Sequence, residues 1–407
     1  MVILRPRWRL TLGTILTGGA LVLCGCAGIS PSGPTVQAGC EASFAGTATL
    51  PSDAGAVYVL PFDPANQPMT LSTAVGTDCG PPLVLADAPE QVSQSGLTAE
   101  APVTGTFELF YYQRTGATSA PLYFLPTVIN RGKTAIHVTI ARAGATVGAT
   151  APTTDMMFED EFLKTTVHQV LTVQPNRWVW LDPSATEHAT APNGLAVGQF
   201  LLATSGPVTV AVVATPSPAK ADPLDMKVLP IIHNDSAGRG LFPHSARQMS
   251  FAAHTYPVVF PLDRTSKTLD PYVTGTDSAT GLPATDVGNY GVLYQVHLAL
   301  NGTPGTVLGV FLSAGGPGSA QAEADVADVE QLPGNHTVML PADDEPPSAS
   351  NAGVLMTTVT IPPNGTGQVD VRLLPPSGLD ALMHIVVLPM SQVELAFTGV
   401  NPALVSS

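Results

Sequence analysis

The sequence predicts an all-β protein in which two β-sandwich domains, immunoglobulin-like or jelly-roll-like, follow one another with short helical insertions. Short runs of β-branched and aromatic residues recur along the chain, bounded by Gly, Pro, Asn or Asp. The 407 residues include 38 Gly and 39 Pro, and only 12% are charged, against about 25% in an average soluble protein. This composition excludes a helical bundle, which needs long Leu, Glu and Lys runs, and a disordered chain.

The N-terminus has the pattern of an export signal. Arg5, Arg7 and Arg9 precede an uncharged apolar run over residues 10–23, which is too short to span a bilayer comfortably. The run ends in Leu-Cys-Gly-Cys at 23–26, which resembles a bacterial lipobox. That resemblance implies a signal peptide over 1–25, a lipid on Cys26 and a flexible tether over 26–39. The alternative is an ordinary cleaved signal with incidental cysteines.

Processing at this site makes the chain more acidic. Loss of the three Arg leaves 13 basic against 31 acidic residues, a net charge of −18. Such an excess argues against general nucleic-acid binding, which needs clustered Lys and Arg. We therefore expect an extracytoplasmic protein of the bacterial cell envelope, anchored to a membrane by lipid. Its expected partners are that membrane and an envelope protein or a glycan, and no cofactor is expected.

Two cysteines remain after Cys24 leaves with the signal and Cys26 is acylated. These are Cys40 and Cys79, and an even pair in an exported protein predicts a disulfide. A metal-binding pair or two free thiols is the alternative.

The body of the chain reads as strands separated by turns. Two segments look helical, 156–170 and 319–331, and both carry acidic residues. The clearest predicted strands are 56–60, 106–112, 122–129, 135–140, 177–181, 208–213, 291–300, 306–312 and 384–388.

A weak internal repeat suggests that this pattern occurs twice. A strand, an Asn turn and a strand occupy 122–144, and the same order recurs over 293–315. A Pro-Asn turn and then an apolar strand follow each copy. The predicted organisation is two tandem sandwiches around a linker rich in Pro, Gly, Asp and Ser, with the boundaries 40–214 for the first domain, 215–250 for the linker, 251–395 for the second domain and 396–407 for a C-terminal tail.

Five short segments occur in a recognisable order along the body of the chain: 88–97, 105–110, 130–133, 205–211 and 288–291. Together they resemble a family of secreted proteins of unknown function known mainly from cyanobacteria (domain of unknown function 3370). The resemblance implies an exported, β-rich protein and carries no catalytic residues. The lipobox and the pair Cys40 and Cys79 are not features of that family.

Catalytic motifs are missing from the sequence. It contains no G-x-S-x-G elbow, phosphate-binding loop, H-E-x-x-H, C-x-x-C or G-x-G-x-x-G. Although scattered catalytic residues leave no such motif, this absence favours a non-enzymatic protein. The leading hypothesis is a non-catalytic role in binding, adhesion or envelope assembly.

Trp178 and Trp180 suggest a carbohydrate-binding or hydrolytic alternative. Strand side chains alternate, so both rings face the same side and could stack on a sugar. Packing inside a sandwich core is the competing interpretation. A hydrolase would also use one of three acidic clusters, at 159–161, 323–330 and 343–345, which otherwise read as solvated surface.

A metal-binding envelope protein is the second alternative. His233, His244 and His254 are the nearest approach to a histidine cluster, and imidazole binds Zn or Cu. Their spacings of 11 and 10 residues match no compact metal motif, so exposed or hydrogen-bonded histidines are the simpler interpretation.

Overall fold

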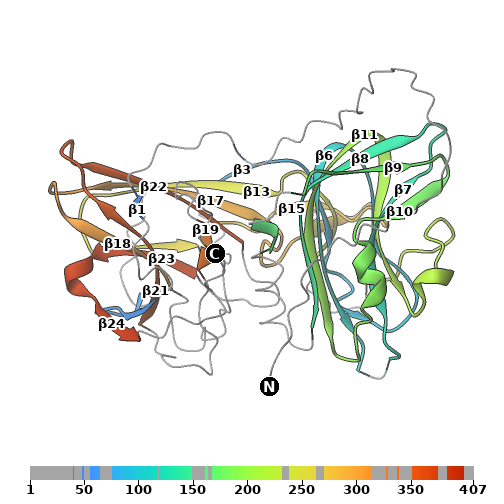
Figure 1. The fold of residues 1–407 in the computed structure, drawn as a ribbon, viewed down its shortest axis with the longest axis horizontal. Helices are drawn as coiled ribbons and strands as arrows, with labels where there is room; N and C mark the ends of the chain where they lie inside the picture. The colour runs from blue at the N-terminus through green and yellow to red at the C-terminus, as the bar shows by residue number, and fades with distance from the viewer. Residues whose placement is uncertain are drawn as a thin grey trace, which may run out of the picture. The chain divides into compact units, whose positions relative to one another are not determined.

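The structure is a computed structural model, and it confirms the all-β fold class (Figure 1). The described residues form three β-sheets, all within a compact unit that begins at Gly33. The described ranges are 40, 48–49, 56–64, 76–117, 119–148, 161–163, 167–231, 238–262, 270–313, 327–328, 337–338, 351–374 and 383–397.

The largest sheet contains eleven strands. Its main path runs β10-β7-β11-β6-β4-β12-β15-β16, while β5 pairs with β6, and β8 pairs with both β11 and β9. The strands are β4 (Leu83–Ala86), β5 (Gln91–Val92), β6 (Gly96–Thr115), β7 (Tyr123–Asn130), β8 (Ile136–Gly148), β9 (Gln169–Val173), β10 (Arg177–Trp180), β11 (Leu195–Thr215), β12 (Arg239–Phe242), β15 (Thr274–Thr276) and β16 (Pro283–Thr285).

The two long strands of this sheet, β6 and β11, pair along most of their length, and their pairing is interrupted by a β-bulge. The β6–β11 register shifts between Thr204 and Val208, opposite Gly105, whose φ is +73°. On its other side β11 pairs with β8 before the bulge and with β7 after it. The strands predicted at 106–112 and 208–213 are therefore parts of much longer strands, because a bulge bends a strand without ending it.

The other two sheets contain seven and six strands. Their paths run β14-β23-β18-β21-β2-β24, with β1 paired to β21, and β20-β19-β22-β17-β13-β3. The seven are β1 (Ala48–Thr49), β2 (Val57–Val59), β14 (Val258–Leu262), β18 (Val307–Ser313), β21 (Ala352–Thr360), β23 (Met383–Pro389) and β24 (Glu394–Phe397). The six are β3 (Thr77–Cys79), β13 (Ala246–Ala253), β17 (Leu293–Asn301), β19 (Ala327–Asp328), β20 (Thr337–Val338) and β22 (Thr366–Leu373).

The repeat seen in the sequence has a counterpart in strand pairing. In the first copy β7 pairs with β10 and β8 pairs with β9. In the second copy β17 pairs with β22 and β18 pairs with β21. Each copy thus pairs its outer strands with each other and its inner strands with each other. The turns that separate them begin at Asn130 and Asn301, the last residues of β7 and β17.

Strands from the start of the body join sheets built by the end of the chain. The short strands β1 and β2 pair with β21, and β3 pairs with β13. The segment expected as a linker, 215–250, contributes β12, which pairs with β4, and the start of β13. Pairing therefore crosses the boundaries drawn from composition.

Helical structure is short. Residues 161–163 are helical within the segment expected as a helix over 156–170, but β9 already begins at Gln169. Of the helix expected over 319–331, only β19 lies in the described residues, and it is a strand. Three 3-10 helices are described: η2 (Pro183–Glu187), η3 (Pro218–Lys220) and η4 (Met390–Gln392).

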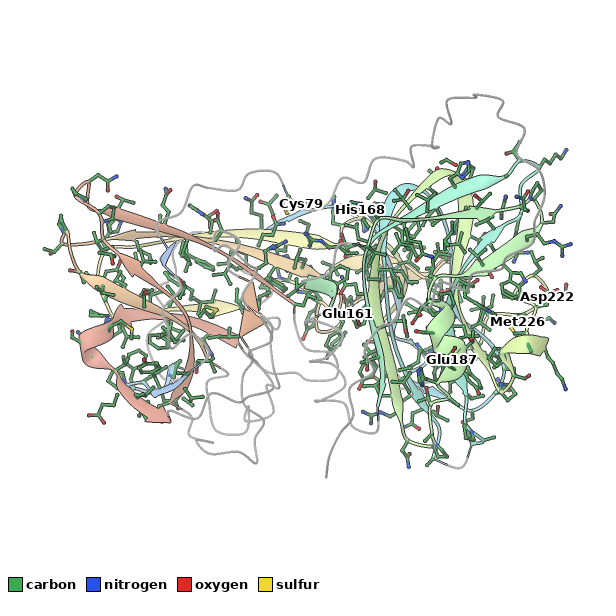
Figure 2. All side chains as sticks on the ribbon, in the orientation of Figure 1. Cys79, Glu161, His168, Glu187, Asp222 and Met226 are labelled. Atoms are coloured by element: carbon green, nitrogen blue, oxygen red, sulfur yellow. A yellow bond between two sulfur atoms is a disulfide. The ribbon has the colours of Figure 1, made fainter. Side chains whose placement is uncertain are left out.

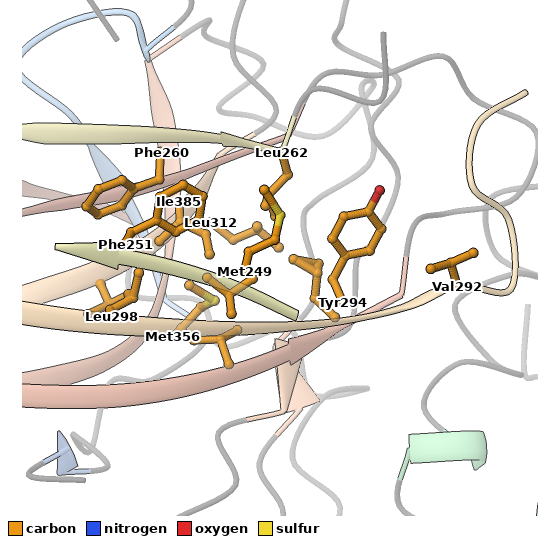
Figure 3. Packing of buried hydrophobic residues seen from close by; sticks show 14 of the residues in the cluster. Met249, Phe251, Phe260, Leu262, Val292, Tyr294, Leu298, Leu312, Met356 and Ile385 are labelled. Carbon is orange, nitrogen blue, oxygen red and sulfur yellow. The ribbon is translucent and has the colours of Figure 1, made fainter. Parts of the chain in front are cut away.

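The inward-facing apolar side chains of the sheets form two large hydrophobic cores. One contains side chains of both the seven- and six-stranded sheets, such as Val387 and Leu298, and extends to Phe110 and Tyr112 of β6. Figure 3 shows part of it, including the stacked rings of Phe251 and Phe260, whose centroids are 4.7 Å apart. The other core lies within the eleven-stranded sheet and gathers residues of β6, β7, β8 and β11. The two faces of β6 thus pack into different cores.

Candidate aromatic binding surface

The two tryptophans lie side by side on β10, the terminal strand of the main path of the eleven-stranded sheet. Their ring centroids are 4.2 Å apart and the rings are tilted by 47°. Both side chains are partly buried, whereas Val179 between them packs on the opposite face, against the core of this sheet. The alternation predicted from the sequence is confirmed. The rings occupy neither a closed core nor a fully exposed surface.

A small apolar cluster supports the rings from below. Trp178 and Trp180 pack on a layer of buried residues from β6, β7, β11 and η2, together with Ala221, which directly follows η3. Other partly buried side chains stand beside them on this cluster, and we call the set the aromatic surface: Tyr123, Trp178, Trp180, Leu224, Met226 and Val228. Figure 2 labels Met226 of this set, Glu187 at the end of η2 and Asp222, which lies shortly after η3.

Local hydrogen bonds fix the turns that border the aromatic surface. Asp182 caps η2, because its Oδ1 accepts hydrogen bonds from Ser184 N at 2.9 Å and Ser184 Oγ at 2.6 Å. Asp222 Oδ1 accepts from Leu224 N at 3.1 Å. Strand β10 itself is held against β7 by Thr127 Oγ1, which donates to Val179 O at 2.8 Å. The rings therefore project from a strand that is hydrogen-bonded to β7 and is followed by a capped turn.

The chemistry of this surface is that of a ligand platform. An indole offers a flat apolar face and an N–H donor, which suits a ligand with one apolar and one polar face. The exposed carboxylates of Glu187, Asp222 and Asp225 lie on the segments that border it and can accept hydrogen bonds from hydroxyls.

The other predicted site residues are not brought together. Cys26 and His233 lie outside the described residues. His244 is exposed, with Nδ1 3.5 Å from Gly80 O, and His254 is also exposed. In the described ranges no three His, Cys, Asp or Glu side chains are grouped as a metal site. Of the three acidic clusters, only Glu161 and Asp328 are described.

Cys40 and Cys79 are joined by a disulfide in the structure, with Cα atoms 5.4 Å apart. Cys79 ends β3, and both cysteines pack against a cluster that includes Phe162, Leu201 and Leu293. The pairing that the cysteine count predicts is thus geometrically accommodated.

Sequence reasoning missed a buried polar cluster around Arg247 on β13. Its Nε donates to Asp78 Oδ1 at 2.6 Å, and its Nη1 donates to Asp270 and to Pro271 O. The Tyr294 hydroxyl is 2.8 Å from both Asp270 carboxylate oxygens, and Asn289 Nδ2 donates to that hydroxyl at 2.8 Å. Burial raises the pKa of Tyr294 well above its usual value, so its hydroxyl stays a donor.

Two further polar side-chain pairs escaped the sequence analysis because their partners are far apart in the chain. Arg239 Nε donates to Asp277 at 3.2 Å, in a nearly buried pair. His297 Nδ1 lies 2.6 Å from Asp370 Oδ1, between the neighbouring strands β17 and β22. Among these residues, Asn289 lies in the Gly-Asn-Tyr-Gly segment at 288–291, one of the segments that carry the family resemblance, and Tyr294 and His297 lie in the predicted strand 291–300.

Comparisons with known proteins add little. No family model and no curated protein matches the chain, so the resemblance given above stays a prediction. The exported protein XepA of PBSX has 11% identity over 72% of this chain and 86% of its own, with a TM-score of 0.12. An uncharacterised protein from Burkholderia cenocepacia has 12% identity over 84% and 83%, with a TM-score of 0.16. TM-scores this low support no conclusion.

Among the described residues we find no helix with the length and apolar character needed to cross a membrane.

Proposed function

We propose that this protein is a non-catalytic binding protein of the bacterial cell envelope, anchored by lipid at Cys26, which recognises glycans through its aromatic surface. The observation that carries the binding role is the pair Trp178 and Trp180, side by side and partly exposed on β10. The lipobox pattern at 23–26 supports the anchor. Several acyl chains together hold a protein firmly, since each buried CH₂ is worth about 0.8 kcal/mol.

A sugar is the ligand class that best fits the surface. The C–H face of a pyranose ring is apolar and matches an indole face, while its hydroxyls match carboxylate acceptors at the border. An apolar peptide would need a deeper groove, because peptide anchors are held in well-packed, desolvated pockets. The excess of acidic residues disfavours anionic ligands such as nucleic acid.

Tryptophan fluorescence tests the binding role directly. The chain has three Trp, and processing before Cys26 removes Trp8, so Trp178 and Trp180 are the fluorophores of the mature protein. We expect a glycan array to identify a bound oligosaccharide, and titration of that oligosaccharide to shift the emission. Trp178→Ala and Trp180→Ala should each weaken binding at least tenfold, as loss of an interface Trp commonly does.

The matched control is Leu282→Ala, because Leu282 is a large apolar side chain that is 63% exposed between β15 and β16. This variant should bind as the unaltered protein does. Full affinity in both tryptophan variants, with folding verified by circular dichroism, would refute the assignment of the surface.

Palmitate labelling tests the anchor separately. Cys26→Ala should abolish incorporation of radiolabelled palmitate in a bacterial host, because the thiol is the acylated group. Cys24→Ala should keep it, since it leaves Leu23, Gly25 and Cys26 in place. Labelling that persists in Cys26→Ala would remove the anchor from the proposal without affecting glycan binding.

A further inference from the structure

A buried carboxyl group sits where the eleven-stranded sheet meets the segments that begin two strands of the six-stranded sheet. Glu108 lies on β6, and the residue is only 3% exposed. Gln199 Nε2, from β11, donates to Glu108 Oε2 at 2.7 Å and to Gly291 O at 2.9 Å. One amide therefore links the carboxyl to the backbone just before β17.

A second segment closes over the same carboxyl. Ser245 directly precedes β13, and its hydroxyl faces Glu108. In the described part of the chain, Ser245 Oγ and Gln199 Oε1 are buried and receive no hydrogen bond. A carboxylate can only accept hydrogen bonds, whereas a protonated carboxyl also donates one. Gln199 Nε2 and the Ser245 hydroxyl can each donate to the carboxylate, so it is the burial of Glu108 that favours the neutral acid.

Close backbone packing makes the junction sensitive to such a change. Gly291 has a φ of +72°, and a Cβ there would lie 2.6 Å from Phe110 Cβ on β6. Leu293 N donates to Ser245 O at 2.9 Å, which joins the segments before β13 and β17 to each other. The segment before β17 thus packs closely on β6, two residues along the strand from Glu108.

Few charges act on this group. Burial raises the pKa of Glu108 from 4.5 to about 7, against the smaller lowering effects of Gln199, Ser245 and the charge of Arg142 on β8. On the segment before β13, His244 is exposed and its ring faces Gly80 O. At the start of β17, the Tyr294 hydroxyl donates to Asp270.

We propose that Glu108 is a pH-dependent lock between β6 and the segments that lead into β13 and β17. When protonated, the Glu108 carboxyl is neutral and, through Gln199, links β6 to the backbone before β17 without burying a charge. Without the proton, the junction must either bury a charge or open to admit water, and it loosens. The proposal is independent of glycan binding at the aromatic surface.

The direction of the pH effect follows from linkage. The native state holds the Glu108 proton to a higher pH than the unfolded chain does, so its contribution to stability is complete below about pH 4.5. The contribution falls as the pH rises towards about 7 and is lost above it. A difference of about 2.5 pKa units corresponds to a change of up to about 300-fold in the unfolding equilibrium.

The test compares urea unfolding of the mature protein and of Glu108→Gln between pH 5 and pH 8. Gln is neutral at every pH, so the unfolding constant of Glu108→Gln should lack the rise of about 70-fold that Glu108 adds between pH 5 and pH 8. The matched control is Glu100→Gln on the same strand, whose side chain is 28% exposed and pairs with Arg131. It should keep the pH dependence. Equal pH dependence in Glu108→Gln and the unaltered protein would overturn the proposal.

Hydrogen exchange keeps the test decisive if Glu108→Gln does not fold. In the unaltered protein, amide exchange in residues 240–246 and 289–294 should be less protected at pH 8 than at pH 6 after correction for the intrinsic rate. Exchange of β18, distant in pairing from this junction, provides the internal reference. Equal protection of 240–246 and 289–294 at the two pH values would overturn the lock.

Discussion

Replacing Asp270 by Asn tests how strongly the buried polar cluster holds the segment before β15. Both partners of the Arg247–Asp270 ion pair are buried, since the Arg247 side chain is 1% exposed and that of Asp270 is 0% exposed. Asp270 also accepts from the Tyr294 hydroxyl. In Asp270→Asn the guanidinium keeps Asp78 as its one counterion among the described residues, so its buried charge is much less compensated.

The expected cost can be scaled from the burial of each partner. Removing one member of a buried pair commonly costs about 3–5 kcal/mol, because the remaining charge is uncompensated. We therefore expect Asp270→Asn to lower the free energy of unfolding by about 3–5 kcal/mol. Asp78→Asn should cost about 1 kcal/mol, since the Asp78 side chain is 37% exposed and water screens its charge.

Urea unfolding at neutral pH measures both variants, and a double variant separates charge burial from packing. Arg247→Met combined with Asp270→Asn removes both charges, so it should be less destabilised than Asp270→Asn alone. The reasoning fails if Asp270→Asn costs no more than Asp78→Asn, or if the double variant is the least stable of the three.

Two further predictions concern backbone constraints. Gly291→Ala should lower the free energy of unfolding by about 2–4 kcal/mol in urea melts, because the new Cβ would collide with Phe110. Gly281→Ala should cost only about 1 kcal/mol, since its φ is +71° but no atom lies within 4 Å of the new Cβ. Equal costs for the two variants would contradict the packing at Gly291. Reduction of the bond between Cys40 and Cys79 should cost about 4 kcal/mol, as expected for a loop of this length. Thiol titration of the unfolded, unreduced protein should find neither cysteine reactive, and two reactive thiols would contradict the bond.

The strands were predictable because each one is a local pattern. Runs such as 122–129 and 306–312 coincide closely with β7 and β18, since β-branched residues and bounding turns are adjacent in sequence. Their true lengths were not predictable in β6 and β11. Gly105 and the Ser-Gly-Pro at 205–207 are ordinary turn signals locally, and only the opposing strand makes them bulges.

The buried polar groups could not be predicted from sequence, because their partners meet only after the sheets form. Arg247 and Asp78 are 169 residues apart, and Glu108 and Gln199 are 91 apart. Local sequence gives no reason to bury Glu108, since a lone Glu on a strand is usually exposed. Its burial follows from β6 having both faces covered, by the core of its own sheet and by the core it shares with the other two.

The environment of the tryptophan pair was predictable in part: its shared face from the sequence, but not what covers that face. This partial covering allows a core role and a binding role to be separated by experiment. Strand alternation predicts that Trp178 and Trp180 share a face, but the covering of that face depends on η2 and residues 221–228. These segments support the rings from beneath and leave them partly exposed. A core role needs only their packing, so Trp178→Phe would largely satisfy it. Glycan stacking needs the wide indole face, so Trp178→Phe should keep stability while weakening binding, and loss of stability with binding intact would reverse the assignment.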